Sequence, residues 1–396
     1  MHKKACSFAR GMKKTDIVYF LMSIITILIT WLMFDYLDIN TLTAWSIDFW
    51  DLVFNRNLHI TDFYDYTANN YHGAYQLYCE GEFLSFLPLF IWNLPLWIVM
   101  KIFSITSVNN IYILSWSKLC FVFAHLGIAW LACRINKKLG GGENQISALL
   151  VLAAPEIIIS TCYAGQDEVI YIFSLLVGVL LILYNRWKMA FVFLVVTVTC
   201  CPIMILPVTA ILLLKEKRIG KLLLYEAILF VPLFLFEVIF HNNEIYQTVK
   251  QKHSLSVYGM QMLEDTLVNT GVGAVSISVV LCLLILLWCY CKGTDNAKNY
   301  LTTVTLIMVI ICFGMSNIFY RQFLYVPFLI ILIMDNITYI DFNVFLFTVF
   351  TYMRVLRGLW VNEVQNMNIV WVVRDSWVTF LCDKVNGSQR YLDEGN

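Results

Sequence analysis

Residues 165–188 read GQDEVIYIFSLLVGVLLILYNRWK. The charge-free apolar run in the middle is preceded by Asp167 and Glu168 and followed by Arg186 and Lys188. An α-helix needs about 20 apolar residues to cross the hydrocarbon of a bilayer, and basic residues at helix ends remain on the cytoplasmic side. The stretch therefore predicts a membrane-spanning helix that ends at the cytoplasmic face.

The whole chain has the composition of an integral membrane protein. Its 396 residues are 60% hydrophobic and only 14% charged, and the mean hydropathy is +0.73. A soluble globule has no core large enough for such a share of apolar residues. The 27 Lys and Arg balance the 27 Asp and Glu. There is thus no basic excess of the kind that attracts nucleic acid, and we expect no nucleic-acid partner.

Apolar runs of similar length recur in both directions from this stretch. They occupy residues 17–34, 84–103, 111–133, 146–163, 168–184, 190–214, 222–240, 272–291, 300–317, 323–336 and 341–356, with a weaker run at 366–382. We therefore predict an all-α, multi-pass protein of the cell membrane with about 10–13 transmembrane or re-entrant helices.

The sides of the membrane follow from the basic residues. Residues 1–16 are basic and are predicted to be cytoplasmic, so the first run leads outward. It delivers residues 35–83, which contain eight acidic residues and one basic residue, to the outer face as a long first loop. Arg134 is also expected inside, which requires the segment Asn93-Leu94-Pro95 to break its run into a re-entrant piece.

A second break is expected within the run 190–214, which lies between two basic clusters. Cys201-Pro202 interrupts it, because proline removes a helix hydrogen bond. Two interpretations remain open: a re-entrant helical hairpin, which we favour, and a single kinked helix.

Four aspartates of the long loop are candidates for chemistry. Asp48 and Asp51 are three residues apart, as are Asp62 and Asp65, so each pair shares one face of a short helix lying at the membrane surface. A carboxylate at lipid-headgroup depth can act as a general base, taking a proton from an acceptor hydroxyl while a lipid-linked phosphate leaves. Asp65 and Tyr66 are expected to help bind the substrate.

A cation is expected to hold that phosphate. Arg321, between two apolar runs, is the best candidate, because a guanidinium clamps phosphate oxygens with two hydrogen bonds. Lys118 is the second, since a lysine inside an apolar run faces protein or water. Three further ionisable residues lie inside apolar runs, where they pair with Lys118 or line a cavity: Glu156, Glu226 and Glu237.

The order of these features resembles a known family. The turn Gly165-Gln166-Asp167-Glu168 is followed by an apolar run, the basic turn 185–188, a second run broken at Pro202, and a basic end at 215–218. This pattern resembles the middle of bacterial polytopic glycosyltransferases of the C-type superfold, which are similar to mannosyltransferases that use polyprenyl-phosphate sugars. Asp62-Phe-Tyr-Asp-Tyr66 is likewise similar to the start of the first outer loop in that family. Many relatives carry a lysine before the proline, where this chain has Cys200-Cys201.

The resemblance implies the activity and its parts. The donor is a sugar on polyprenyl phosphate, and the acceptor is a lipid-linked or cell-surface glycan. The catalytic base is an aspartate of the first outer loop, which leaves Asp48, Asp51 and Asp62 as alternatives. Gln166 and Asp167 are expected to bind substrate. No cofactor is required, and a divalent metal is optional, with no metal-ligand set assigned.

The expected organisation has four parts. A basic N-terminus (1–16) precedes a catalytic membrane module (17–240), a C-terminal transmembrane module (241–382) and a polar tail (383–396). Two other classes of function remain open. One is a transporter or lipid flippase that uses Lys118 and the intramembrane glutamates as a relay, and the other is a non-catalytic subunit of a membrane assembly. The chain lacks the repeated halves typical of secondary transporters, which favours the enzyme.

Overall fold

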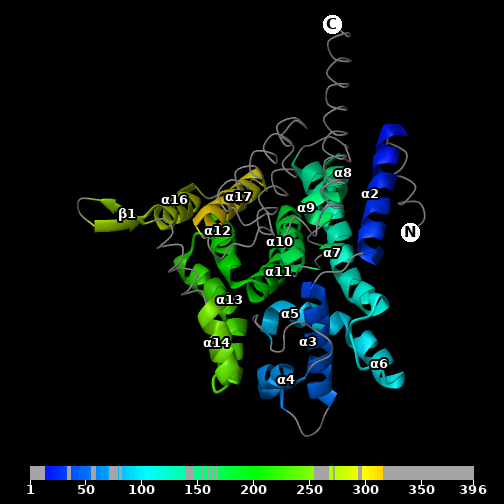
Figure 1. Ribbon diagram of the computed structural model, residues 1–396. Helices are drawn as coiled ribbons and strands as arrows, with labels where there is room; N and C mark the ends of the chain where they lie inside the picture. Colours follow the sequence, from blue (N-terminus) through cyan, green and yellow to red (C-terminus); the bar gives the residue numbers. More distant parts are fainter. Residues whose placement is uncertain are drawn as a thin grey trace. The chain divides into compact units, whose positions relative to one another are not determined.

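Apolar helices dominate the computed structural model of the chain (Figure 1). It describes residues 14–33, 37–54, 59–70, 79, 83–139, 146–153, 155–158, 161–162, 165, 168–253, 267–270, 273–292 and 297–314. The predicted helical class is confirmed for these residues. The predicted runs 323–336, 341–356 and 366–382, and the termini 1–13 and 383–396, lie outside them.

The first part of the chain forms helices at the predicted runs and in the long loop. They are α2 (Lys14–Met33), α3 (Leu37–Phe54), η1 (Ile60–Asp62), α4 (Phe63–Asn69), α5 (Phe83–Trp92), α6 (Leu94–Ile102), α7 (Ile111–Lys138), α8 (Ile146–Ala153) and α9 (Pro155–Ile158). Helix α7 packs against α2, α3, α8 and α10 with a broad buried face, whereas Tyr112, Trp116, Phe123 and Trp130 are exposed on its other side.

The second part continues the pattern. Its elements are α10 (Glu168–Leu183), α11 (Trp187–Cys200), η3 (Pro202–Met204), α12 (Ile205–Lys215), α13 (Ile219–Phe240), α14 (Glu244–His253), β1 (Leu267–Thr270), β2 (Gly273–Ser276), α16 (Ile277–Lys292) and α17 (Ala297–Gly314). The antiparallel pair β1 and β2 is a local addition that the apolar periodicity did not predict. Helix α12 packs against α16 and α17, whereas α11 packs mainly against α10.

Both predicted helix breaks are present. Helices α5 and α6 meet at Asn93 with a bend of 59°, and Pro95 stands in the first turn of α6, where its missing N–H costs nothing. Helix α11 ends at Cys200, and Pro202 opens the short 3₁₀ turn η3 before α12 begins. The run 190–214 is thus two helices with a break where the proline predicts one.

Some helices have the length that a bilayer requires. Within the described residues, Ile111–Lys138 and Ile219–Phe240 are long and apolar enough to cross a membrane, and the bent pair α5 and α6 adds a third if it forms one span. Several shorter helices of 10–17 residues are also apolar. These lengths are compatible with a membrane protein.

The long first loop is more deeply packed than its polar residues predict. The sequence predicts short helices that lie at the membrane surface. Instead, α3 is 18 residues long and packs against α4, α5, α6 and α7. Phe49 stacks on Phe90 with ring centroids 4.9 Å apart. Only α4, with seven residues, has the predicted short length.

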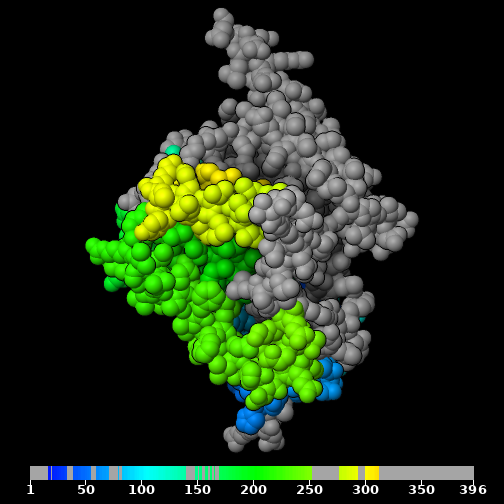
Figure 2. Space-filling model, turned by 90° about the vertical axis from the view of Figure 1, so that its left-hand side faces the viewer, coloured from blue at the N-terminus to red at the C-terminus, as the bar shows by residue number. Residues whose placement is uncertain are grey.

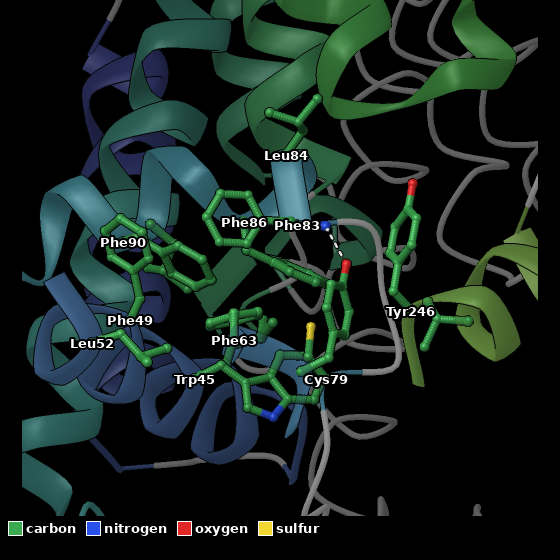
Figure 3. Close-up of a cluster of buried hydrophobic side chains, with 14 of the residues drawn as sticks. Trp45, Phe49, Leu52, Phe63, Cys79, Phe83, Leu84, Phe86, Phe90 and Tyr246 are labelled. Atoms are coloured by element: carbon green, nitrogen blue, oxygen red, sulfur yellow. Dashed lines mark hydrogen bonds between the residues drawn. The ribbon is translucent and has the colours of Figure 1, made fainter. Parts of the chain in front are cut away.

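An aromatic cluster joins this loop to the helices that follow it (Figure 3). Tyr64 is fully buried, and its hydroxyl accepts a hydrogen bond of 3.1 Å from the backbone N–H of Phe83. That N–H belongs to the first turn of α5, where a helix has no internal acceptor. Tyr64 also packs edge-on against Phe240 and contacts Tyr246. The cluster therefore fixes α4 against α5, α13 and α14.

Candidate functional site

Asp51 is paired with a lysine and a tryptophan of a later helix. It lies in the last turn of α3 and faces Trp97 and Lys101, which are four residues apart and so share one face of α6. The Oδ1 atom accepts a hydrogen bond of 2.7 Å from Trp97 Nε1 and lies 2.7 Å from Lys101 Nζ. Within the described part of the chain, Oδ2 accepts no hydrogen bond. The side chain is 11% exposed.

Aromatic rings surround this carboxylate. Phe54 lies three residues after Asp51 on α3. It stacks on Trp97, with ring centroids 4.7 Å apart and 18° between the ring planes. Trp50 also stacks on Phe54, with ring centroids 5.8 Å apart. Phe54 itself is more than half exposed. The arrangement offers flat apolar rings beside a charged pair.

Tyr66 completes the same region from α4. Partial burial raises the pKa of its phenol, and the negative charge of Asp51 raises that pKa further, with a smaller contribution from Asp48. The phenol therefore stays protonated and can donate a hydrogen bond. Of the residues predicted to act together, the structure brings together Asp48, Asp51 and Tyr66.

The other aspartates have different surroundings. Asp48 is 1% exposed, within the interior of α3. Asp62 closes the turn before α4, because its Oδ2 accepts the backbone N–H of His59 at 3.1 Å and its Oδ1 accepts the hydroxyl of Thr61 at 3.2 Å. These local bonds give Asp62 a turn-closing role.

Asp65 connects two loops. Its Oδ2 accepts a hydrogen bond of 2.6 Å from Asn243 Nδ2, and the Asn243 side chain also accepts the backbone N–H of Tyr246 in the first turn of α14. The first loop and the loop after α13 therefore meet through one carboxylate. Asn243 carries no sequence signal beyond its position just before a helix, where asparagine is a common cap.

Lys118 is fully buried on α7, near the segment that leads to Gly165. It is near enough to Cys162 to interact with it electrostatically. His125, seven residues later on the same face of α7, lies 3.1 Å from the hydroxyl of Thr161. Thr161 is thus held against α7.

Gly165 packs closely against α3. Its φ of +64° is in the left-handed region, and a Cβ there would stand 2.9 Å from Cδ1 of Ile39. Glycine is therefore the residue that this close approach requires. The segment that begins the Gly-Gln-Asp turn lies against the helix that carries Asp48 and Asp51.

Several predicted residues lie outside the described part. Gln166, Asp167 and Arg321 are not described, nor is the side chain of Glu156. Glu226 and Glu237 are described, and their partners differ from Lys118. Glu226 accepts a hydrogen bond from Thr209, and Glu237 binds Lys250 at 2.6 Å and Tyr246 at 3.2 Å. These pairings lend no support to a charge relay through Lys118.

Two residues at the site were missed by the sequence analysis. Trp97 and Lys101 were read as the end of an apolar run, although Lys101 stands alone in it and its spacing from Trp97 is helical. Their partner Asp51 is too distant in sequence for any pattern to reveal. In the described residues no group of three or more His, Cys, Asp or Glu side chains is placed to hold a metal ion.

Comparison with known proteins adds no relative. No family model, no curated protein and no solved structure matches this chain.

Proposed function

We propose that the protein is a membrane glycosyltransferase that moves a sugar from a polyprenyl-phosphate donor to a glycan or glycolipid acceptor, with Asp51 as the general base. The observation that carries the proposal is the geometry of Asp51. One carboxylate oxygen is bound by Trp97 and Lys101, while the other accepts no hydrogen bond from a described residue, and the side chain is 11% exposed. A base must be oriented and also reachable, and this carboxylate combines the two properties.

The remaining aspartates suit this role less well. Asp48 is enclosed, so an acceptor hydroxyl has no direct approach to it. Both oxygens of Asp62 are used in a turn. Asp65 is exposed and has one oxygen bound to Asn243, but the resemblance does not offer it as the base. The resemblance to the C-type family left Asp48, Asp51 and Asp62 as alternatives, and local geometry favours Asp51.

In the proposed reaction, Oδ2 of Asp51 takes the proton of an acceptor hydroxyl. The hydroxyl oxygen forms a bond to the anomeric carbon of the donor sugar, and the bond from that carbon to the phosphate oxygen breaks. The polyprenyl phosphate leaves with the electron pair. Lys101 orients the base, and we propose that Arg321 and Lys118 stabilise the phosphate charge, with Gln166 and Asp167 binding substrate.

Helix α13 supports an outer location for this site. Its 22 residues give a length of about 33 Å, close to the hydrocarbon thickness of a bilayer. The basic residues Arg218 and Lys221 are at its beginning, whereas α14, which contacts α4, follows its end. If basic residues remain cytoplasmic, α4 and its neighbour Asp51 face outward. We propose on this basis a multi-pass cell-membrane protein with a cytoplasmic N-terminus and about 10–13 transmembrane or re-entrant helices.

The test is a transfer assay with the full-length protein in lipid vesicles and labelled polyprenyl-phosphate sugars. We expect Asp51→Asn to lower kcat by about 10²–10⁴-fold, the usual contribution of a general base, with a smaller change in KM. Asp65→Asn is the matched control, because its amide oxygen can still accept the hydrogen bond from Asn243, and it should retain activity within a few-fold.

Two outcomes contradict the proposal. The base assignment is wrong if Asp51→Asn transfers sugar as fast as the unmodified chain. The function is wrong if the unmodified chain, correctly folded by its thermal unfolding profile, transfers no sugar from any polyprenyl-phosphate donor.

A further inference from the structure

A basic surface region lies at the beginning of α13, far along that helix from the proposed site. It combines the turn before α11 with the turn between α12 and α13. Its cations are Arg186, Lys188, Lys215, Lys217, Arg218 and Lys221, and its only acidic residue is Glu216. We call these seven residues the basic turn region.

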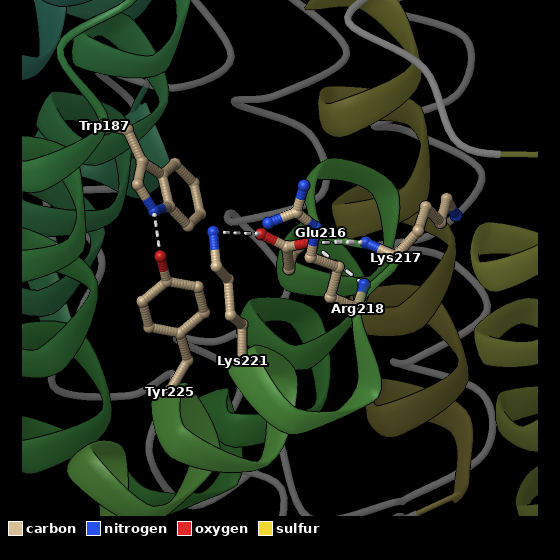
Figure 4. Close-up of polar contacts among 6 residues, drawn as sticks. All are labelled: Trp187, Glu216, Lys217, Arg218, Lys221 and Tyr225. Carbon is tan, nitrogen blue, oxygen red and sulfur yellow. Dashed lines mark hydrogen bonds and ion pairs between the residues drawn. The ribbon is translucent and has the colours of Figure 1, made fainter.

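One hydrogen bond holds the two turns together (Figure 4). Trp187, the first residue of α11, donates from Nε1 to the hydroxyl of Tyr225 at 3.2 Å. Tyr225 is four residues after Lys221 and so lies on the same face of α13. The rings of Trp187 and Tyr225 also meet edge-on at 5.8 Å. The two clusters of cations therefore form one patch.

Some of these cations already have partners inside the protein. Lys217 Nζ donates to the carbonyl oxygens of Leu213 at 2.7 Å and Cys289 at 2.8 Å, and also to that of Tyr290. It thereby satisfies the ends of α12 and α16. Partial burial lowers the pKa of Lys217.

The charge of Lys221 is partly compensated, whereas two other cations form no ion pair with a described residue. Lys221 lies 3.8 Å from Glu216, and that carboxylate also accepts the backbone N–H groups of Lys217 and Arg218. Arg186 and Lys188 are exposed, and neither forms an ion pair with any described residue. The patch therefore has unused positive charge.

An exposed apolar surface begins directly beside the patch. Ile219 and Leu223 in the first turns of α13 are both more than 60% exposed. The exposed apolar side chains continue along the helix at Leu224, Ile228, Phe230, Val231, Phe234, Leu235, Val238 and Ile239. Figure 2 shows this face, where the green and yellow residues that include α13 and α16 form much of the surface. Cations thus border an apolar strip of membrane length.

We propose that the basic turn region binds the phosphate headgroup of an anionic phospholipid, with one acyl chain lying along α13. Phosphate satisfies the unpaired charges of Arg186 and Lys188, and the strip accepts the hydrocarbon. Trp187 and Tyr225 have the amphipathic rings that proteins place at headgroup depth. A soluble anion would use the charges but not the strip, so the combination favours a lipid.

The test measures binding of phosphatidylglycerol and of zwitterionic phosphatidylcholine to the full-length protein in detergent by native mass spectrometry. Each cation near a membrane surface changes anionic-lipid affinity by about fivefold. We expect Lys188→Gln to weaken phosphatidylglycerol binding about fivefold and Arg186→Gln with Lys188→Gln about 25-fold. Lys250→Gln, which removes one cation beyond the other end of α13, should leave it unchanged.

Glu216→Gln provides a variant with the opposite expected sign. It removes the one negative charge of the basic turn region while leaving an oxygen for the backbone N–H groups, so phosphatidylglycerol binding should become tighter. This gain cannot arise from misfolding.

Three results overturn the proposal. The first is equal binding of phosphatidylcholine and phosphatidylglycerol. The second is that Lys250→Gln weakens phosphatidylglycerol binding as much as Lys188→Gln does. The third is complete competition by inorganic phosphate at the concentration of the lipid, which would assign the patch to a free anion. None of these results bears on sugar transfer, because the patch and Asp51 share no residue.

Discussion

The two ends of α13 contrast in how they hold charge. At its end, the α3–α4–α14 region places acidic side chains among stacked aromatic rings, and Asp51 meets its lysine at 2.7 Å. At its beginning, the basic turn region places cations at the surface, and Glu216 meets its lysine at 3.8 Å. The first region is packed tightly enough to orient a reacting group, whereas the second is open enough to exchange partners. This difference is why we assign chemistry to one and lipid binding to the other.

The largest expected difference between the regions is in packing. Tyr64→Ala should lower the free energy of unfolding by about 3–5 kcal/mol, since it removes a fully buried ring and the acceptor for an α5 backbone N–H. Tyr225→Ala, at the half-buried position, should cost about 1 kcal/mol. Thermal and denaturant unfolding in detergent measure both. Equal losses would mean that the two regions are equally packed.

The second comparison uses two glycines. Gly165→Ala should destabilise the protein by at least about 1–2 kcal/mol, because alanine is strained at positive φ and its Cβ would press on Ile39. Gly220→Ala is the control, because a Cβ there meets nothing within 4 Å and alanine favours the helix. It should be neutral or stabilising in the same unfolding assay, and a loss at position 220 would contradict the open packing of that region.

The third comparison concerns the two ion pairs. A double-mutant cycle on Asp51 and Lys101 should show a coupling of about 1 kcal/mol in unfolding, because the pair is short and one partner is mostly enclosed. The same cycle on Glu216 and Lys221 should show no measurable coupling. Added salt should weaken the first coupling only slightly. A larger coupling in the second pair would reverse the distinction.

The smallest effect is a shift in titration. The pKa of Tyr66 is raised above its ordinary value by burial and by Asp51, so its contribution to stability is fully present below the ordinary tyrosine pKa and is lost as pH rises through the raised value. Asp51→Asn should lower that pKa, and Asp65→Asn should leave it in place. Difference absorbance of the phenolate, with Tyr66→Phe subtracted, measures it. If the pKa of Tyr66 is unchanged in Asp51→Asn, Tyr66 does not interact with Asp51 and does not belong to the proposed site.

Much of the helical architecture was predictable because it follows from local chemistry. Apolar runs gave helices near the expected residues, and each predicted break is followed by a proline, Pro95 or Pro202, in the first turn of the next element. The depth of α3 was not predictable, since Thr43 and Ser46 look solvent-seeking but bond backward to their own helix at Ile39 and Leu42.

The candidate site was predictable only in part. Helical spacing grouped Asp48 with Asp51, and both lie close to Tyr66. The same spacing grouped Asp62 with Asp65, but each has its own partner. Lys101 was not predicted as a partner, because contacts between distant segments depend on how helices pack, which no single-sequence pattern records.

The position of Lys217 has a consequence for how the chain is assembled. Its ammonium ties the last turn of α12 to carbonyls of α16 that lie more than 70 residues later, at Cys289 and Tyr290. During synthesis α12 leaves the ribosome first, so for that interval its lysine has no α16 to bind. The contact forms only after α16 has been made, which makes the joining of these two helices a late step in biogenesis.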